Sequence, residues 1–448
     1  MKSLVQIAAE LQGYDPQAMT AQDVTVFLSR LVTPVHDVQE LPLFEALGRV
    51  LAEDVISPFD VPPHDNSAMD GYAFSGAQLA ASAALDLRVV GTAMAGKAWQ
   101  GKVQLGECVK IMTGAVMPAG LDTVVPQEFV LRRKCGEADG ITIPPDLLQT
   151  GDNRRQRGED LQKSKAALQK GELLTPARLG LAASLGLATV KTWRALRVAY
   201  FSTGDEILSL GEAPREGAVY DSNRYTVFGM LRRLGCQVID LGVVHDDPVL
   251  LEAAFNKAAA QADVIITSGG VSVGEADHTK AMMKQLGDVA FWRIAMRPGR
   301  PMAVGRISAN KFPSKAIDPG LKSHEKYGTY PGAVMFGLPG NPVAVMVTFL
   351  AFVRPALLQM MGSTAGPIPL LKARCSEAIR KKPGRTEYQR GWVSSQPDGS
   401  LWAQTTGSQG SGVLRSMAEA NGLLVLHHEQ GNVAIGDEVD VLMFDGAI

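Results

Sequence analysis

The spacing of apolar and polar residues changes along the chain and divides it into segments of different predicted structure. Residues 20–31 carry apolar side chains at helical spacing and predict a helix with Thr20 as N-cap. Between residues 85 and 150, short apolar runs alternate with glycine turns, which predicts an all-β module inserted in the chain. From residue 196 to 358 strand-length and helix-length segments alternate, and after residue 362 strands and turns return.

The alternating region predicts a doubly wound α/β domain, because strands that alternate with helices of this length form sheets covered by helices. The expected strands are 196–201, 238–244, 264–266 and 289–292, and the expected helices 223–234, 248–260, 278–286 and 342–358. Ligands bind such sheets outside the carboxyl ends of the strands. This rule places a group of glycines and acids on one rim, namely Gly204, Asp205, Glu206, Asp246, Gly269, Gly270, Glu275 and Asp277.

The segment at 262–280, ADVIITSGGVSVGEADHTK, combines a β-branched strand, a glycine turn and the start of a helix. Gly269 and Gly270 allow backbone N–H groups to face a ligand, and the helix N-terminus also favours an anion. Glu275 and Asp277 beside such a site would repel the anion unless a hard cation such as Mg²⁺ bridges them. A turn whose two acids merely cap the helix is the alternative interpretation.

Two segments are rich in arginine. Residues 291–301, FWRIAMRPGRP, contain Arg293, Arg297 and Arg300, whose guanidinium groups are suited to phosphate or another oxyanion. Beside an acid-lined rim, we expect an oxyanion site here rather than a simple basic loop. Residues 151–160, GDNRRQRGED, form a charge run that is typical of a solvated face, with a phosphate contact as the alternative.

Several segments outside the α/β pattern have simpler predictions. A short helix is expected at 42–47 and an ordered proline-rich loop at 58–72. Asn341 followed by Pro342 predicts the start of the long apolar helix, whose free N–H groups offer a second anion cradle. Residues 308–332 predict an inserted surface loop. A separate small β-domain follows, with strands expected at 375–379, 386–396, 401–406, 422–426 and 438–443.

Composition narrows the class of protein. The 448 residues correspond to roughly three domains. A net charge of −2 provides no basic field for nucleic acid. The start of the chain lacks the pattern of a signal peptide, and no apolar run reaches the roughly 18 residues that span a bilayer. The four cysteines are scattered, without a zinc or disulfide pattern, so we expect a cytoplasmic protein with no membrane contact.

The ordered motifs together resemble one family. DNSAMDGYA, IMTGAVMP, RRQRGED, STGDEI, YDSNR, DDP, TSGGVSVGEAD, FWRIAMRPGRP, GLPGNP and SQGS occur in the order found in the MoeA-type molybdopterin molybdenumtransferases, with which the E domain of gephyrin is homologous. The resemblance covers essentially the whole chain. It departs in having Arg at 293, 297 and 300, where Lys is frequent, and in the longer connection at 308–332.

The resemblance implies a multidomain α/β plus β protein that forms an elongated homodimer. It implies an N-terminal helical and linker part (1–58 and 152–194), an inserted β-rich domain (59–151), a central molybdopterin-binding-like α/β domain (195–358) and a C-terminal β-barrel (359–448). The implied enzyme inserts molybdate into adenylylated molybdopterin with Mg²⁺ and releases AMP. Transient contact with a molybdopterin adenylyltransferase and with molybdoenzyme maturation proteins is expected as well.

The family's functional positions can be carried over by motif. They fall on Asp70, Thr113, Asp160, Glu206, Asp246, Asp277, Arg293, Arg297, Pro339, Pro342, Arg390 and Ser411. The expected ligand-binding set adds Gly204, Ser268, Gly269, Gly270, Ser272, Arg300, Gly340 and Asn341, and the expected Mg²⁺ ligands are Glu206, Glu275 and Asp277. Asp70 and Thr113 would close the cleft from the partner subunit.

Two other functions stay open from the sequence. A molybdopterin adenylyltransferase shares the central fold, but its glycine motif typically reads TGGTG, whereas Val271 and Ser272 follow the glycines here. A non-catalytic scaffold of the gephyrin type is the second alternative. The acidic and basic rim residues favour the enzyme that inserts molybdenum.

Overall fold

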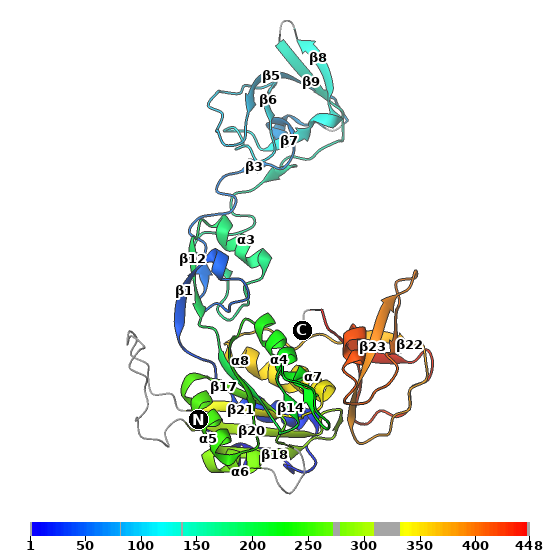
Figure 1. The fold of residues 1–448 in the computed structure, drawn as a ribbon. Coiled ribbons are helices and arrows are strands. Elements are labelled where there is room, and N and C mark those ends of the chain that lie inside the picture. Colours follow the sequence, from blue (N-terminus) through cyan, green and yellow to red (C-terminus); the bar gives the residue numbers. More distant parts are fainter. Residues whose placement is uncertain (1, 81, 136–137, 272–277, 309–331, 446–448) are drawn as a thin grey trace, which may run out of the picture.

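Three six-stranded sheets and a slender linker organise the chain (Figure 1). The structure is a computed structural model that describes residues 2–80, 82–135, 138–271, 278–308 and 332–445. The α/β domain lies at one end, the β-rich domain lies at the far end of the linker, and the C-terminal barrel lies beside the α/β domain. The predicted α/β domain, β-rich insertion and C-terminal barrel are therefore confirmed.

The central sheet of the α/β domain is mixed. Across the sheet its strands are β16 (Gln237–Val244), β13 (Arg197–Thr203), β17 (Val264–Ser268), β21 (Ala333–Leu338), β20 (Pro301–Ile307) and β18 (Gly287–Arg293). The first four run parallel to one another. β20 runs antiparallel to β21, and the edge strand β18 runs antiparallel to β20 and so in the same direction as the first four. The sequence analysis missed β20, because its apolar run directly follows the arginine segment. The four parallel strands end at one rim, as the prediction required.

Alternating side chains bury the two faces of this sheet under different helices. Ala199 and Phe201 of β13 pack in one cluster with α5 (Pro248–Gln261) and α6 (His278–Leu286). Val198 and Tyr200 point to the other face and pack with α4 (Ser222–Arg233) and the helix that starts at Pro342. This period of two is expected for a strand buried on both faces.

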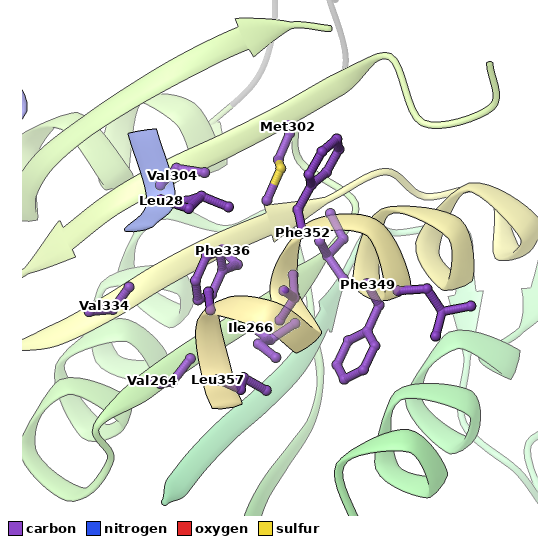
Figure 2. Packing of buried hydrophobic residues seen from close by; sticks show 14 of the residues in the cluster. Leu28, Val264, Ile266, Met302, Val304, Val334, Phe336, Phe349, Phe352 and Leu357 are labelled. Atoms are coloured by element: carbon purple, nitrogen blue, oxygen red, sulfur yellow. The ribbon is translucent and has the colours of Figure 1, made fainter. Parts of the chain in front are cut away.

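One long apolar helix covers the second face (Figure 2). It runs through α7 (Pro342–Thr348), the π-helical turn η4 (Phe349–Val353) and α8 (Arg354–Met360). Pro355 explains the turn, because its missing N–H and its ring cannot continue the regular hydrogen-bond ladder. By length and composition this helix could cross a membrane, but most of it is buried against Phe336, Ile266 and their neighbours.

The N-terminal helices also pack on the central sheet. These are α1 (Leu4–Ala9) and α2 (Ala21–Leu31), the latter capped by Thr20 as predicted. The ring of Phe27 packs edge-on against Trp292 of β18 at 4.9 Å between centroids. The predicted boundaries group these helices with the linker part, whereas the hydrophobic core groups them with the α/β sheet.

The linker is held together by short antiparallel pairs. Its elements are β1 (Val38–Pro42) with β12 (Thr189–Trp193), β2 (Val55–Ile56) with β11 (Ala166–Leu168), β3 (Asn66–Ser67) with β10 (Arg154–Arg155), and α3 (Pro176–Ser184). The helix predicted at 42–47 is wrong: Pro42 ends β1, and only the 3₁₀ turn η1 (Leu43–Glu45) follows.

Arg194 joins the linker to the α/β domain. Its Nη1 and Nη2 donate to the two carboxylate oxygens of Asp263 at 2.6 and 2.7 Å. Its Nε donates to Asp37, just before β1, at 2.6 Å. The Arg194 and Asp263 side chains are only 9% and 7% exposed, so this bidentate pair is shielded from solvent.

The β-rich domain is one curled sheet with apolar clusters on both faces. Its strands, in order across the sheet, are β7 (Thr123–Pro126), β4 (Gly71–Phe74), β6 (Glu107–Ile111), β5 (Leu85–Ala93), β9 (Ala138–Ile143) and β8 (Leu131–Cys135). Two short 3₁₀ turns, η2 (Gly76–Gln78) and η3 (Gln127–Phe129), complete it.

The C-terminal domain is a closed barrel of five strands. They are β23 (Thr386–Ser395), β24 (Leu401–Thr405), β22 (Leu371–Cys375), β26 (Glu438–Met443) and β25 (Gly422–Leu426), which pairs back to β23. The strand expected at 375–379 is wrong, because β22 ends at Cys375. A short strand of the arginine segment, β19 (Met296–Arg297), pairs with β23 and joins the barrel to the α/β domain. The helix α9 (Arg415–Glu419) follows the loop that faces that domain.

Candidate functional site

A cleft of about 1430 Å³ opens where the rim of the α/β sheet meets the barrel. Its walls come from the ends of β13 and β17, the arginine segment, the start of α7 and the barrel loop 409–414. The short pair β14 (Ile207–Leu208) and β15 (Val219–Tyr220) adds a further edge. This is the position outside the carboxyl ends of the strands that the sequence analysis predicted.

Acidic side chains line one part of the cleft. Glu206 is exposed after β13, and Asp246 lies at the start of the turn into α5. Asp246 accepts a hydrogen bond from Thr279 Oγ1 at 3.3 Å. Carboxylate oxygens are the donors that a hard cation prefers. The expected ligands Glu275 and Asp277, and Ser272 beside them, lie outside the described residues, as does nearly all of the predicted loop at 308–332.

The glycine turn after β17 is built for close approach of the backbone. Gly269 has φ +90°, and a Cβ there would lie 2.4 Å from the carbonyl oxygen of Thr203. Ser268 Oγ, directly before it, lies 2.7 Å from Tyr200 Oη, which also contacts Ser202 Oγ at 2.9 Å. Burial raises the pKa of Tyr200, so this tyrosine stays neutral and orients the two serine hydroxyls.

The three predicted arginines face the same cleft. Arg293, Arg297 and Arg300 are all exposed and line it, and none forms an ion pair with an acid in the described part of the chain. Gly299, with φ +98°, lets this segment lie against α7, since a Cβ there would be 2.5 Å from Thr348 Oγ1. Guanidinium groups without acidic partners are available to an anionic ligand.

The barrel contributes a further arginine, one that the predicted site set omits. Arg385 lines the cleft and pairs with the buried Glu387 at 2.7 Å. In the sequence it precedes a strand and carries no local signal of function. Only the pairing of β19 with β23 brings it beside Arg297.

The start of α7 also belongs to the cleft. Pro339, Gly340, Asn341 and Pro342 line it, as does Ser411 from the barrel loop. Asn341 is the N-cap, but its side chain forms no capping bond. The N–H of Val343 donates to the carbonyl of Ser411 at 3.1 Å, so one donor of the predicted second anion cradle is already occupied.

Arg390, predicted to bind the cofactor, is fully buried and does not line the cleft. Its guanidinium donates to the carbonyls of Ser408, Gln409 and Gly410 at 2.9–3.3 Å and to Ser416 Oγ at 3.0 Å. Barrel closure turns the side chain inward, under the loop that carries Ser411. In this arrangement Arg390 holds the loop that carries Ser411.

Asp70, Thr113 and Asp160 do not line the cleft of their own chain. Asp70 precedes β4 and Thr113 follows β6, in the domain at the far end of the linker (Figure 1). The backbone N–H and the hydroxyl of Thr113 both donate to Asp70 Oδ1 at 2.7 Å and lower the pKa of that carboxyl group. Asp160 is exposed, and its N–H donates to the carbonyl of Val61.

The second arginine segment, residues 151–160, is paired with acids of the proline-rich segment at 58–72. Arg157 Nε lies 2.6 Å from Asp60, and Arg154 lies 3.5 Å from Asp65. These arginines hold the 151–160 loop against the proline-rich segment at 58–72. Two of its three guanidinium groups are thus committed to neighbouring carboxylates, which disfavours the phosphate contact.

Three further residues of the cleft were not predicted as functional. Thr203, Asp221 and Asn223 line it and are only 3%, 3% and 7% exposed. Asp221 and Asn223 belong to the family motif YDSNR, but neither was assigned a role; Asp221 caps α4 by accepting from the N–H of Arg224 at 3.1 Å. Each of the three also carries a buried oxygen without a hydrogen-bond partner.

The chain matches known protein families along most of its length. Residues 19–186 match the MoeA N-terminal region (domain I and II), 199–359 a probable molybdopterin binding domain, and 372–444 the MoeA C-terminal region (domain IV). The second match contains the strands, the glycine turn and the arginine segment of the cleft.

Relatives and solved structures agree over the full architecture. The molybdopterin molybdenumtransferase of Haemophilus influenzae is 40% identical over 406 residues, 90% of this chain and 93% of the relative. The molybdopterin molybdenumtransferase of Nostoc is 34% identical over 440 residues, 96% and 95% of the two chains. The crystal structure of a molybdopterin biosynthesis MoeA protein from Pyrococcus horikoshii is similar with a TM-score of 0.75 and 26% identity, covering 95% of this chain and all of that one.

Proposed function

The chain belongs to the MoeA family of molybdopterin molybdenumtransferases, transferases of molybdenum cofactor biosynthesis, and we propose that it inserts molybdate into adenylylated molybdopterin with release of AMP. The observation that carries this proposal is the meeting of two charge sets in one cleft. Glu206 and Asp246 line it together with Arg293, Arg297 and Arg300. An adenylylated, phosphorylated substrate and an oxyanion both need this combination.

The donor set suits a divalent cation such as Mg²⁺. Glu206 and Asp246 offer hard oxygen ligands, although no group of three His, Cys, Asp or Glu side chains in the described ranges forms a complete site. When bound there, the cation would neutralise charge on the pyrophosphate. The arginines would bind molybdate and phosphate oxygens, and the backbone N–H of Gly270 would donate to a phosphate oxygen, since that of Gly269 already donates to the carbonyl of Leu338 at 3.2 Å.

The test is AMP release by purified protein given adenylylated molybdopterin, Mg²⁺ and molybdate. We expect AMP in the presence of both ions and a loss of about 10²-fold in Glu206→Gln, since removing one electrostatic contact in an active site typically has this effect. Glu216→Gln, an exposed residue that does not line the cleft, is the matched control.

Three outcomes would overturn the proposal. Equal AMP release by Glu206→Gln and wild type would remove the acidic side from the mechanism. AMP-containing product formed from ATP and free molybdopterin, with none released from the adenylylated form, would instead identify an adenylyltransferase. Binding of substrate without any turnover would favour the scaffold.

We also propose that the active unit is a homodimer in which Asp70 and Thr113 of one subunit reach the cleft of the other. The support is their position: within one chain the linker holds them away from the cleft (Figure 1). Mixing is the sharpest test. Asp70→Asn and Glu206→Gln, inactive alone, should regain about a quarter of wild-type activity when co-refolded, because half of the dimers then hold one intact site of two. No regain would contradict the shared site.

A further inference from the structure

The floor of the cleft contains acceptor atoms that no protein group satisfies. Asp221 Oδ1 accepts the N–H of Arg224, whereas Oδ2 has no partner in the described part of the chain. Asn223 Nδ2 donates to the carbonyl of Gly340 at 2.7 Å, which leaves Oδ1 on the other side of the amide, also unpartnered. Thr203 Oγ1, at the end of β13, is the third such atom.

Leaving these buried atoms unpaired costs folding free energy, which indicates that a ligand pairs with them. A buried polar atom without a hydrogen bond lowers stability, and an ionised oxygen does so more than a neutral one. The guanidinium of Arg224 forms its hydrogen bonds with another acid, donating to both oxygens of Asp240 at 2.6–2.9 Å. Because Asp221 is only 3% exposed, water competes weakly for its unpaired oxygen. A hydrogen bond from a ligand donor to this oxygen would therefore be strong.

The chemistry of the set selects a class of ligand edge. An ionised aspartate and an amide oxygen are acceptors only, so they match an edge with two adjacent donors. The 2-amino-4-oxopyrimidine ring of a pterin presents such an edge, with N3–H beside the 2-amino group. Adenine presents a donor beside an acceptor, which an asparagine matches through its N–H₂ and C=O together. The Nδ2 of Asn223 is already committed to Gly340.

We propose that Asp221, supported by Asn223 Oδ1, binds the N3–H and 2-amino edge of the pterin and so fixes its orientation in the cleft. This subsite rests on the proposed function, since it presumes a pterin substrate. The arginines and the glycine turn then bind the charged parts of that substrate, while Asp221 distinguishes its ring from other bicyclic rings.

The test uses Asp221→Asn. Asparagine keeps an oxygen for the N–H of Arg224 and is itself a good N-cap, so α4 should keep its start. It replaces the free acceptor by an N–H₂ group, which faces the ligand's donors unfavourably. We expect the affinity for pterin-6-carboxylate, followed by its fluorescence, to fall about 10- to 100-fold, as for the loss of one hydrogen bond to a charged group.

Ligand and variant controls separate the alternatives. Wild type should bind lumazine-6-carboxylate, which has an oxo group in place of the 2-amino group, more weakly than the pterin, and Asp221→Asn should change that affinity little. AMP affinity should stay within about twofold, the scale of a surface substitution. Asp247→Asn serves as the control for loss of a capping charge, because Asp247 is the N-cap of α5, a helix that packs on the same sheet.

Unchanged pterin affinity in Asp221→Asn would overturn the assignment, and so would an equal loss for pterin and lumazine. A weaker affinity for AMP with an unchanged affinity for the pterin would instead indicate that the carboxylate binds the adenylate. These measurements need no turnover. Absence of AMP release by wild type would therefore count against the proposed function, while pterin selectivity would still judge the subsite.

Discussion

The two arginine-rich segments have similar composition but opposite surroundings. In the 151–160 loop, Arg157 is bound to Asp60 and Arg154 lies beside Asp65. In the 291–301 segment, Arg293, Arg297 and Arg300 face a cleft without any acidic partner in the described residues. Both segments contain glycine, and both belong to motifs that the family resemblance singled out.

The difference shows what decides the role of a charge cluster. An arginine paired with a neighbouring carboxylate organises the backbone around it, because the ion pair fixes two segments relative to each other. An arginine that lines a cleft without a partner keeps its binding capacity for a ligand. The number of arginines in a segment does not distinguish the two cases from each other, whereas the positions of the neighbouring acids distinguish them.

The largest expected effect separates the two segments by activity. Arg297→Ala should lower AMP release by about 10²- to 10³-fold, as for loss of one preorganised electrostatic contact. Arg157→Ala should leave AMP release within about twofold, because its guanidinium is occupied by Asp60. Arg297→Lys should fall between, since it keeps the charge and loses the planar fork.

Steady-state AMP release at saturating Mg²⁺, with molybdate varied, provides the measurement. A similar loss in Arg157→Ala and Arg297→Ala would erase the distinction between the segments. A loss in Arg297→Ala that excess molybdate fully restores would confine its role to capture of the oxyanion.

Arg390 offers a third surrounding, in which the partners are carbonyl groups. Burial, together with the nearby Arg297 charge, lowers the pKa of Arg390 to about 10. Arg390→Met would leave the carbonyls of residues 408–410 without donors and should lower the free energy of unfolding by about 2–3 kcal/mol. Chemical denaturation measures this, with the exposed Arg415→Met as control. Equal stability of the two variants would contradict the positioning role.

The smallest expected effect is a pH dependence in the paired segment. The N–H of Lys163 and the guanidinium of Arg157 lower the pKa of Asp60 below its usual value. A lowered carboxyl pKa contributes stability above the unfolded-state pKa, about 3.9, and loses it as pH falls through the folded-state value.

The advantage of wild type over Asp60→Asn should therefore be constant from pH 7 to about pH 5 and shrink below about pH 4. Urea midpoints at a series of pH values measure it. Arg297→Ala should show no comparable change against wild type over this range, since no carboxylate is paired with that arginine in the described residues. A constant difference for Asp60→Asn down to pH 3 would contradict the ion pair.

Local patterns were sufficient for most of the α/β domain. The β-branched run of β17, the helix that starts at Pro248, and the Asn341–Pro342 start signal are each decided by neighbours in sequence, and the structure has the predicted elements there. β20 and β21 were missed because the apolar run of β20 directly follows the arginine segment and that of β21 runs into the GLPGNP motif. The short helix at 42–47 failed because Pro42 pairs with Thr189 in the linker.

The same division applies to the cleft. Glu206 and Gly269 follow strand ends, so the rim rule located them, whereas the arginine-rich segment pointed to Arg297. The burial of Arg390 depends on closure of the barrel. The unpaired Oδ2 of Asp221 depends on the guanidinium of Arg224 binding Asp240. Those are tertiary facts, which one sequence does not display. Asp70, Thr113 and Asp160, located by motif alone, do not line the cleft within one chain.

The buried guanidinium of Arg194 has a mechanical consequence. It is bonded to Asp37 on the side of the linker and to Asp263 on the side of the α/β domain, where the two parts meet. Figure 1 shows the linker extending from the α/β domain to the β-rich domain. A tilt of a few degrees between the linker and the α/β domain at this point would displace the β-rich domain, with Asp70 and Thr113. That displacement grows with the length of the linker.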